Sequence, residues 1–344
     1  MKKVVAFGEI MLRLNPPGFL RFGQARSFDI AFGGSEANVC ASLANFGVPA
    51  DFVTRLPMND LGDACIAYLR SFGVGTGKIV RGGKRIGIYF LENGAVQRGG
   101  KVLYDRDGSA VAEIKTGMID WEAAFADADW FHWTGITPAV SEPLCEVCLE
   151  GIRKAKAMGL TVSCDLNYRS KLWKWGKKAG EVMPELVRLS DIAVGNEEAA
   201  DKVFGIQVPD ADAAAGRVEA EKCAAVADGL KRAFPNLRLI AITLRGSVSA
   251  SRNSWSGILY DGSRLYTGPM FDITDIVDRI GGGDAFCGGL IYGLRTYGED
   301  RQKALDFAVA ASCLKHSVVG DFNVATVEEV EKLAAGEVSG RVSR

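Results

Sequence analysis

The sequence has little histidine, no long apolar run and no excess of positive charge. Its 344 residues include two histidines, and 41 lysines and arginines stand against 42 acidic residues. A chain so close to neutral lacks the basic footprint of a nucleic-acid-binding protein. The first apolar run, Val4 to Phe7, is soon followed by Glu9 and is far shorter than a membrane span or the apolar core of a signal peptide. We therefore expect a cytoplasmic protein with no nucleic-acid partner and no membrane contact.

The eight cysteines do not follow the pattern of a metal-binding or disulfide-bonded protein. Cys145 and Cys148 have the Cys-x-x-Cys spacing of metal and redox sites. However, no second such pair lies nearby, and the two histidines, His132 and His316, are not paired. Apolar residues flank the two thiols, namely Pro143, Leu144, Val147 and Leu149. We therefore expect Cys145 and Cys148 on a buried helix, and reduced, mostly buried thiols elsewhere.

Two common nucleotide-binding motifs are also missing. A P-loop needs Gly, four residues and then Gly-Lys-Ser/Thr, whereas Gly77-Lys78 is followed by Ile79 and lacks the earlier glycine. The dinucleotide-binding Gly-x-Gly-x-x-Gly is absent after the first predicted strand, where the sequence reads Phe7-Gly8-Glu9. These absences argue against a P-loop NTPase and against a Rossmann dehydrogenase.

A glycine-rich run does offer a phosphate site: Asp278-Arg279-Ile280-Gly281-Gly282-Gly283-Asp284-Ala285-Phe286. Its three glycines leave backbone N–H groups unshielded, so that a phosphate can approach closely. Ala285 to Leu294 is predicted to be a helix, whose positive N-terminal end would face the same anion. Asp284 follows the amides and could take the proton of an acceptor hydroxyl, as phosphoryl transfer requires. The alternative is a glycine-rich turn whose aspartate caps a helix.

Short β-branched or aromatic runs alternate with segments of helical period along most of the chain. The predicted strands are Val4–Phe7, Phe52–Thr54, Trp130–Trp133, Thr161–Cys164, Ile192–Val194 and Leu239–Leu244. The predicted helices between them include Asp60–Phe72, Glu142–Met158, Asn196–Phe204 and Ala213–Phe234. This alternation predicts an α/β fold with a parallel sheet covered on both faces. Ligands of such sheets bind beyond the carboxyl ends of the strands.

Two regions interrupt the alternation and are rich in turn residues. Residues 10–32 and 84–112 are predicted to form antiparallel strands of a small sheet, placed as a lid over the ligand edge. The α/β core would then comprise residues 1–9, 33–83 and 113–335, with a flexible tail at 336–344. Exposed lid strands are natural pairing edges, so we expect a homo-oligomer through the lid.

A second motif lies about 240 residues before the glycine run. Gly33-Gly34-Ser35-Glu36-Ala37-Asn38 opens an amphipathic segment that ends at Phe46-Gly47, and Asn59-Asp60-Leu61-Gly62-Asp63 follows. This block resembles the N-terminal signature of the ribokinase-like (PfkB) carbohydrate kinases, and Asp278 to Leu294 resembles their C-terminal signature. The resemblance extends from Val4 to about Leu333. It implies the ribokinase-like three-layer fold, with a central, mostly parallel sheet and a small β-sheet lid.

Within this family the likeness is strongest to the 2-keto-3-deoxygluconate kinases. The residues that carry it are Gly8 to Leu14, Tyr104 to Arg106, Asp165 to Arg169, Lys315 to Ser317, and Gly320 with Asp321. The resemblance implies ATP-dependent transfer of a phosphoryl group to the terminal hydroxyl of a sugar acid. It implies Asp284 as the base and the amides of Gly281, Gly282 and Gly283 as the anion hole.

The resemblance also implies a nucleotide side of the site. The matching residues are Asn167, Asn196, Thr243, Arg245, Gly246 and Ser247, the last four in a predicted turn after the strand Leu239–Leu244. A glycine-containing turn there could offer amides to phosphates. The alternative for each residue is an ordinary loop between a strand and a helix.

Two cations follow from the same resemblance. Mg²⁺ is expected with ATP, because it neutralises the nucleotide phosphates. Its protein ligands stay open: many relatives have a glutamate where this chain has Ala199, and Glu197 or Glu198 could compensate. Many relatives also use a monovalent cation, for which Asp278 is a matching ligand. Arg279-Ile280 replaces their Thr-Thr and leaves a K⁺ requirement open.

The substrate prediction depends on charge. Arg106 and Arg169 match substrate positions of the 2-keto-3-deoxygluconate kinases, and a guanidinium suits the carboxylate of a sugar acid. Further matching substrate positions are Gly34, Tyr89, Tyr104 and Asp321. Many neutral-sugar kinases carry an aspartate after Gly-Glu, and Ile10–Leu14 has none. The alternatives are a kinase for a neutral sugar such as fructose and a non-catalytic sugar- or nucleotide-binding protein, with both arginines as surface or ion-pair residues.

Overall fold

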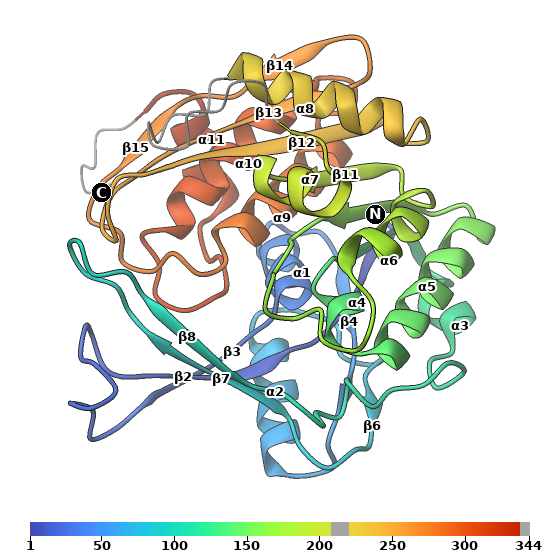
Figure 1. The fold of residues 1–344 in the computed structure, drawn as a ribbon, viewed down its shortest axis with the longest axis vertical. Coiled ribbons are helices and arrows are strands. Elements are labelled where there is room, and N and C mark those ends of the chain that lie inside the picture. The colour runs from blue at the N-terminus through green and yellow to red at the C-terminus, as the bar shows by residue number, and fades with distance from the viewer. Residues whose placement is uncertain (208–219, 338–344) are drawn as a thin grey trace.

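The computed structural model describes residues 1–207 and 220–337, and its largest element is a nine-stranded sheet (Figure 1). The strand order is β14 (Leu265–Thr267), β13 (Asn253–Tyr260), β12 (Leu239–Ser247), β11 (Ile192–Gly195), β10 (Thr161–Asp165), β9 (Ala128–Thr134), β1 (Lys3–Phe7) and β4 (Ala50–Val53), and β15 (Phe271–Ile273) also pairs with β13. Pairing is parallel from β12 to β4 and antiparallel around β13. The predicted α/β class and parallel sheet are confirmed.

Alternation of side chains along the strands produces a hydrophobic core on each face of the sheet. Val4 and Ala6 of β1 lie in one buried cluster, and Val5 and Phe7 lie in the other. The first cluster is closed by α1 (Ser35–Asn45), α2 (Asp60–Ser71), α9 (Gly282–Thr296) and α10 (Arg301–Lys315), and α11 (Val327–Ala334) packs on α10. The second is closed by α3 (Trp121–Phe125), α5 (Glu142–Ala157), α6 (Ala179–Val187), α7 (Glu197–Phe204) and α8 (Ala220–Ala233), with α4 (Thr137–Val140) before α5. Helices therefore cover both faces, as parallel strands require.

The small sheet lies apart from the main one, at the lower left of Figure 1. Its strand order is β3 (Asp29–Gly33), β2 (Met11–Asn15), β7 (Gly87–Glu92) and β8 (Lys101–Asp105), and β5 (Arg55–Leu56) pairs with β6 (Val80–Arg81) separately. The two hairpins, β2–β3 and β7–β8, are antiparallel as predicted. The prediction was wrong for the central pair: β2 and β7 run parallel, because the core segment between them returns the chain in the same direction.

Several local predictions are settled by this fold. Cys145 and Cys148 lie buried on α5, and all eight cysteines are free. The predicted helix 213–234 is observed from Ala220, and its first residues lie outside the described part of the chain. Most of the predicted tail, 338–344, also lies outside it. In residues 1–207 and 220–337, no helix is both long and apolar enough to cross a membrane.

Candidate active site

The glycine run forms the N-terminal end of α9. The helix begins at Gly282, three residues earlier than predicted, and Gly281 precedes it in the left-handed region at φ +82°. A Cβ at Gly281 would overlap the carbonyl oxygen of Asp321, and one at Gly282 would lie 2.9 Å from the His316 ring, whereas Gly283 faces open space. The first N–H groups of a helix have no partner within it. These amides therefore form a cradle at the positive end of a 15-residue helix.

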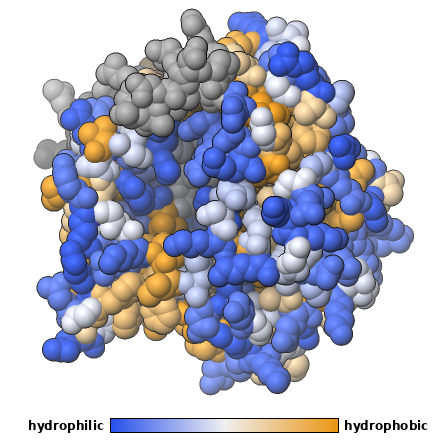
Figure 2. Space-filling view, in the orientation of Figure 1, coloured by the Kyte–Doolittle hydropathy of each residue, from blue (hydrophilic) through white to orange (hydrophobic). Residues whose placement is uncertain are grey.

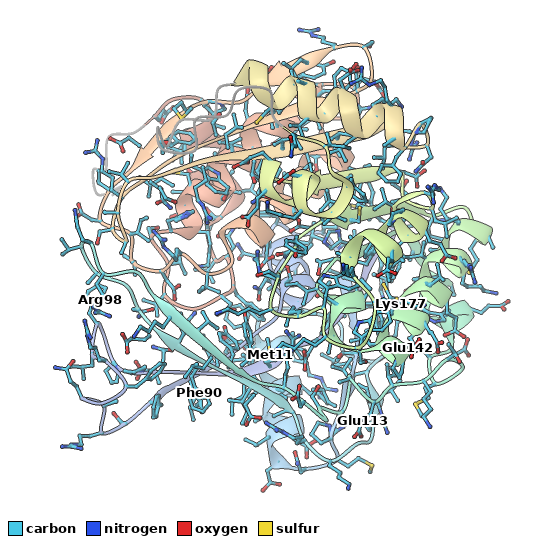
Figure 3. The ribbon with its side chains drawn as sticks, in the orientation of Figure 1. Met11, Phe90, Arg98, Glu113, Glu142 and Lys177 are labelled. Atoms are coloured by element: carbon cyan, nitrogen blue, oxygen red, sulfur yellow. The ribbon has the colours of Figure 1, made fainter. Side chains whose placement is uncertain are left out.

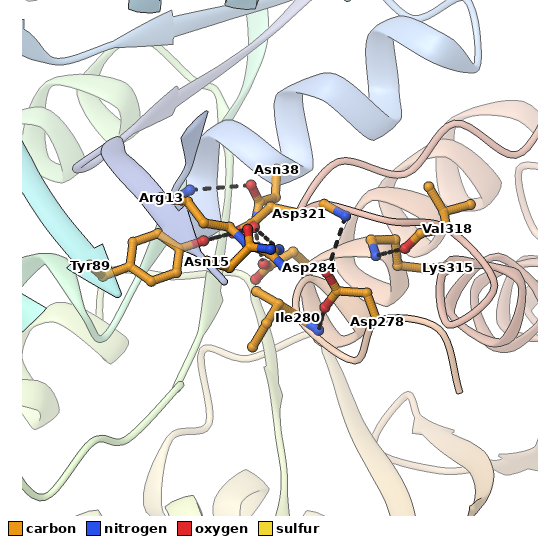
Figure 4. Close-up of polar contacts among 12 residues, drawn as sticks. Arg13, Asn15, Asn38, Tyr89, Asp278, Ile280, Asp284, Lys315, Val318 and Asp321 are labelled. Atoms are coloured by element: carbon orange, nitrogen blue, oxygen red, sulfur yellow. Dashed lines mark hydrogen bonds and ion pairs between the residues drawn. The ribbon is translucent and has the colours of Figure 1, made fainter. Parts of the chain in front are cut away.

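Asp284 lies in the first turn of α9 and faces the N-terminal end of α1. Its two carboxylate oxygens accept hydrogen bonds from the Ser35 hydroxyl and, at 2.6 Å, from the Asn38 amide. Asn38 and Asp284 are labelled in Figure 4. The Asn167 amide donates in turn to Ser35 at 3.0 Å. Burial raises the pKa of Asp284, and the two donors lower it. The carboxylate is thus fixed beside the cradle with its basicity above that of an ordinary aspartate.

A second carboxylate, Asp165, lies at the end of β10 within electrostatic range of Asp284. Burial, and then the charge of Asp284, raise the pKa of Asp165 to about 7. The Asn167 N–H donates to it at 3.1 Å, and Asn167 itself has a positive φ of 34°. Sequence reasoning gave no role to Asp165, Ser35 or Asn38, although all three lie in the segments that carry the family resemblance.

Behind the cradle, the lid sheet and the core meet in a buried polar cluster (Figure 4). Arg13 of β2 contacts Asp278 at 2.5 Å and Asp321 at 2.7 Å, and only 1% of Arg13 is exposed. The Tyr89 hydroxyl, from β7, donates to Asp321 at 2.6 Å. Asp321 therefore ties two lid strands to the segment that follows α10. The sequence analysis did not single out Arg13, because an arginine in an apolar strand gives no sign of its partners.

The two arginines predicted to bind the substrate have different surroundings. Arg106 is buried and donates to Glu9, at 2.7 Å from its Nε, and Ser109 donates to the same carboxylate. Arg169 is exposed, and no carboxylate of the described residues forms an ion pair with it. Its guanidinium donates to the Tyr168 carbonyl at 3.2 Å, and its charge contributes to lowering the pKa of both Asp284 and Asp165. Arg169 is thus the guanidinium with unused hydrogen-bonding capacity.

The other predicted substrate positions line the region between the lid and α1. The Tyr89 and Tyr104 rings lie 6.2 Å apart, and Arg106 lies over the Tyr104 ring at 5.5 Å. Gly34 precedes α1 in extended backbone, where a Cβ would overlap the Glu9 carbonyl oxygen. The structure therefore brings Tyr89, Tyr104 and Asp321 together.

The predicted turn at Thr243–Ser247 was wrong. β12 continues to Ser247 and pairs with β13, so that Arg245 stands opposite Trp255 and Gly246 opposite Ser254. The antiparallel strand β13 takes up the backbone hydrogen bonds of this segment. Gly246 alone gives no sign of that pairing, because the partner strand is not encoded locally. The charge of Arg245 nevertheless contributes to lowering the pKa of His316, beside Gly282, to about 4, although burial is the main cause.

The remaining nucleotide-side positions also have structural partners. Thr243 donates to the Gly195 carbonyl at 3.3 Å, at the junction of β11 and β12. Asn196 caps α7, where its side-chain oxygen accepts from the Ala199 N–H at 2.8 Å. Within the described residues, no group of three or more His, Cys, Asp or Glu side chains is arranged to hold a metal. Mg²⁺ bound with a nucleotide keeps several waters and uses phosphate oxygens with one or two carboxylates.

The chain is similar to known proteins over almost its whole length. A model of the pfkB family carbohydrate kinases matches residues 1–326. The chain is 33% identical to a 2-dehydro-3-deoxygalactonokinase of Haloferax volcanii, over 98% of each chain. It is 27% identical to a 2-dehydro-3-deoxygluconokinase of Thermoproteus tenax, over 93% of this chain and 90% of the relative. The crystal structure of a 2-dehydro-3-deoxygluconokinase of Thermotoga maritima superposes with a TM-score of 0.92 at 48% identity, covering 98% of this chain and 100% of that one.

Proposed function

Because the chain belongs to the pfkB family of carbohydrate kinases, we propose that it phosphorylates the terminal hydroxyl of a sugar acid at the expense of ATP. The proposed substrate is 2-keto-3-deoxygluconate (2-dehydro-3-deoxygluconate), and the proposed product is its 6-phosphate. Two relatives, at 33% and 48% identity, are named for 2-keto-3-deoxy sugar acids, which supports this substrate class. A cytoplasmic location stays a prediction.

The observation that carries the substrate proposal is the exposed guanidinium of Arg169. Among the described residues it has no ion pair and donates only to the Tyr168 carbonyl, and its charge acts on Asp284. The carboxylate of a sugar acid would supply its missing partner through charge-assisted hydrogen bonds. Arg106 already donates to Glu9, so its predicted contact with the carboxylate of the sugar acid would be secondary. A neutral sugar would leave Arg169 without an anionic partner.

In the proposed reaction, the acceptor hydroxyl loses its proton to Asp284. The hydroxyl oxygen bonds to the γ-phosphorus as the bond to the ADP oxygen breaks, and ADP leaves. The amides of Gly281, Gly282 and Gly283 would hold the charge of the transferred phosphoryl group. Mg²⁺, when bound, neutralises the nucleotide phosphates. Ser35 and Asn38 keep the base oriented.

The remaining residues would position the two substrates. Tyr89, Tyr104, Asp321 and the backbone at Gly34 are proposed to contact the carbon chain and hydroxyls of the sugar acid. The nucleotide would lie on the other side of the cradle. Its proposed contacts are Asn167, Asn196, Thr243, Arg245, Gly246 and Ser247.

The experiment that tests the substrate class is Arg169→Ala, with Arg153→Ala as the matched control. Arg153 is an exposed arginine on α5 and pairs with Glu185, neither of which belongs to the predicted site. Loss of a charge-assisted pair, about 1.5–3 kcal/mol, should lower kcat/KM for 2-keto-3-deoxygluconate by about one to two decades. Turnover of fructose should change much less. Equal losses on the acid and on fructose would contradict the sugar-acid proposal.

We also propose that two copies of the chain pair through the outer face of the lid. One row of side chains crosses all four strands there, and its members stand directly opposite one another: Ile30, Leu14, Phe90 and Leu103. Ile30 and Leu103 are 68% and 57% exposed, and apolar side chains gather over the lid where Phe90 lies (Figures 2 and 3). Light scattering should give the mass of a dimer, and Leu103→Asp should give that of a monomer. A wild type that is monomeric at all concentrations would contradict this proposal.

A further inference from the structure

Lys315, the last residue of α10, is a fully buried lysine directly behind the cradle. None of its surface is exposed, and no carboxylate of the described residues forms an ion pair with it. Its ammonium donates to the Val318 carbonyl at 3.0 Å (Figure 4). Its side chain passes 3.3 Å from the position that a Cβ on Gly281 would take. A buried ammonium is costly unless nearby charge compensates it. The proposed reaction assigns it no role.

The compensating charge comes from the polar cluster that Arg13 occupies. Asp278 and Asp321 are 4% and 3% exposed, and their charges raise the pKa of Lys315 against the larger lowering effect of its burial. Arg13 and Lys315 carry two positive charges, and Asp278 and Asp321 carry two negative ones. These four side chains balance one another in charge, and the charge of Asp284 also raises the pKa of Lys315.

A monovalent cation does not fit beside these residues. Both oxygens of Asp278 are engaged: one accepts from Arg13 at 2.5 Å and from the Gly320 N–H at 3.1 Å, and the other accepts from the Ile280 N–H at 3.0 Å. The Val318 carbonyl already accepts from the Lys315 ammonium. A K⁺ ion there would need several such oxygens to replace its water, and it would place a third positive charge beside the buried Arg13 and Lys315.

We propose that the Lys315 ammonium, together with the Arg13 guanidinium, is the resident cation behind the cradle, and that this chain needs no monovalent metal ion for phosphoryl transfer. Lys315 is a positioning residue: it holds the Val318 segment against Gly281 and contributes positive charge behind the amides. The statement about turnover rests on the proposed kinase function. The statement that K⁺ does not bind the cluster is independent of that function.

The first test measures wild-type kcat and KM in potassium chloride and in tetramethylammonium chloride at equal ionic strength. Tetramethylammonium is too large for a site of this kind. We expect equal kinetic constants in the two salts, and melting temperatures that show no K⁺-specific rise, since an ion that binds only the native state would raise them. A K⁺-specific increase in kcat, or in melting temperature, would overturn the proposal. If no sugar is phosphorylated in either salt, the proposed function fails, while the melting comparison still tests the cation site.

The second test uses two substitutions of Lys315 and a control on the same helix. Lys315→Ala leaves space that K⁺ can enter, whereas Lys315→Met fills the space with an apolar chain. Both should lower kcat in tetramethylammonium by about 10²-fold, the typical effect of one electrostatic group at such a site. K⁺ should restore part of the kcat of Lys315→Ala and none of that of Lys315→Met. Lys303→Met, on the exposed side of α10, should behave as the wild type.

Two results would overturn the role of Lys315. One is a wild-type kcat in Lys315→Met. The other is a folded Lys315→Ala whose kcat is reduced and does not respond to K⁺, because that pattern indicates packing alone. If Lys315→Ala does not fold, Lys315→Met and the wild-type comparison still decide the question, since the thioether chain fills a similar volume without a buried charge.

Discussion

Replacing Asp284 by asparagine should abolish turnover while preserving the shape of the site. The substitution keeps one oxygen and converts the other into an NH₂ group that cannot accept the acceptor's proton. Removal of a general base typically lowers the rate by about 10²–10⁴-fold. In the wild type, Asp284 accepts from both Ser35 and Asn38, so the NH₂ group of the new asparagine will face one of these two donors. The Ser35 hydroxyl can rotate to accept instead, and we therefore expect folding and substrate binding to change little.

The assay is steady-state kinetics with 2-keto-3-deoxygluconate and ATP, with ADP release as the readout. Asp306→Asn is the matched control: Asp306 is a half-buried aspartate on α10 that accepts from Gln302. The control should keep wild-type kcat and KM, and both variants should melt as cooperatively as the wild type. If Asp284→Asn retained more than about a tenth of the wild-type kcat, Asp284 would not be the base, because a general base typically raises the rate by at least about 10²-fold.

Two further predictions concern the neighbours of Asp284. Gly282→Val should lower kcat by about 10²–10³-fold, because a side chain would meet the His316 ring and disturb one amide of the cradle; a variant that melts and turns over normally would reduce the glycines to a turn. Asn38→Ala removes a donor that lowers the pKa of Asp284, so the base stays protonated to higher pH. The pH below which kcat/KM falls should therefore be higher than in the wild type. Asn45→Ala, on the same helix, should leave that pH unchanged.

The sequence predicted most of the fold because its local patterns agree with the sheet that forms. Apolar runs such as Val4–Phe7 and Thr161–Cys164 became central strands, and the turn-rich regions became the lid. The failures were non-local. Gly246 indicated a turn, but the antiparallel neighbour β13 extends the strand through it. The β2–β7 pairing depends on the path of the core between these strands, which no local pattern encodes.

The site was predictable to the extent that its residues lie in short motifs. The Gly281–Asp284 run indicated, from local chemistry, a helix N-terminus with a carboxylate beside it, and both are observed. Arg13 was missed because its partners, Asp278 and Asp321, lie 265 and 308 residues away. Arg106 shows the same difficulty, since Glu9, 97 residues away, holds its guanidinium. Charge pairs of this kind become visible only when the lid is placed against the core.

The most direct test of the sugar-acid proposal is a comparison of substrates with the wild-type enzyme. We would measure kcat/KM for 2-keto-3-deoxygluconate and for fructose with ATP, and locate the new phosphate ester by NMR. We expect kcat/KM to be higher for the acid by at least about one to two decades, because of the carboxylate contact, and we expect the phosphate on the terminal oxygen of the acid. Equal or better turnover of fructose, or a phosphate at another position, would contradict the proposal.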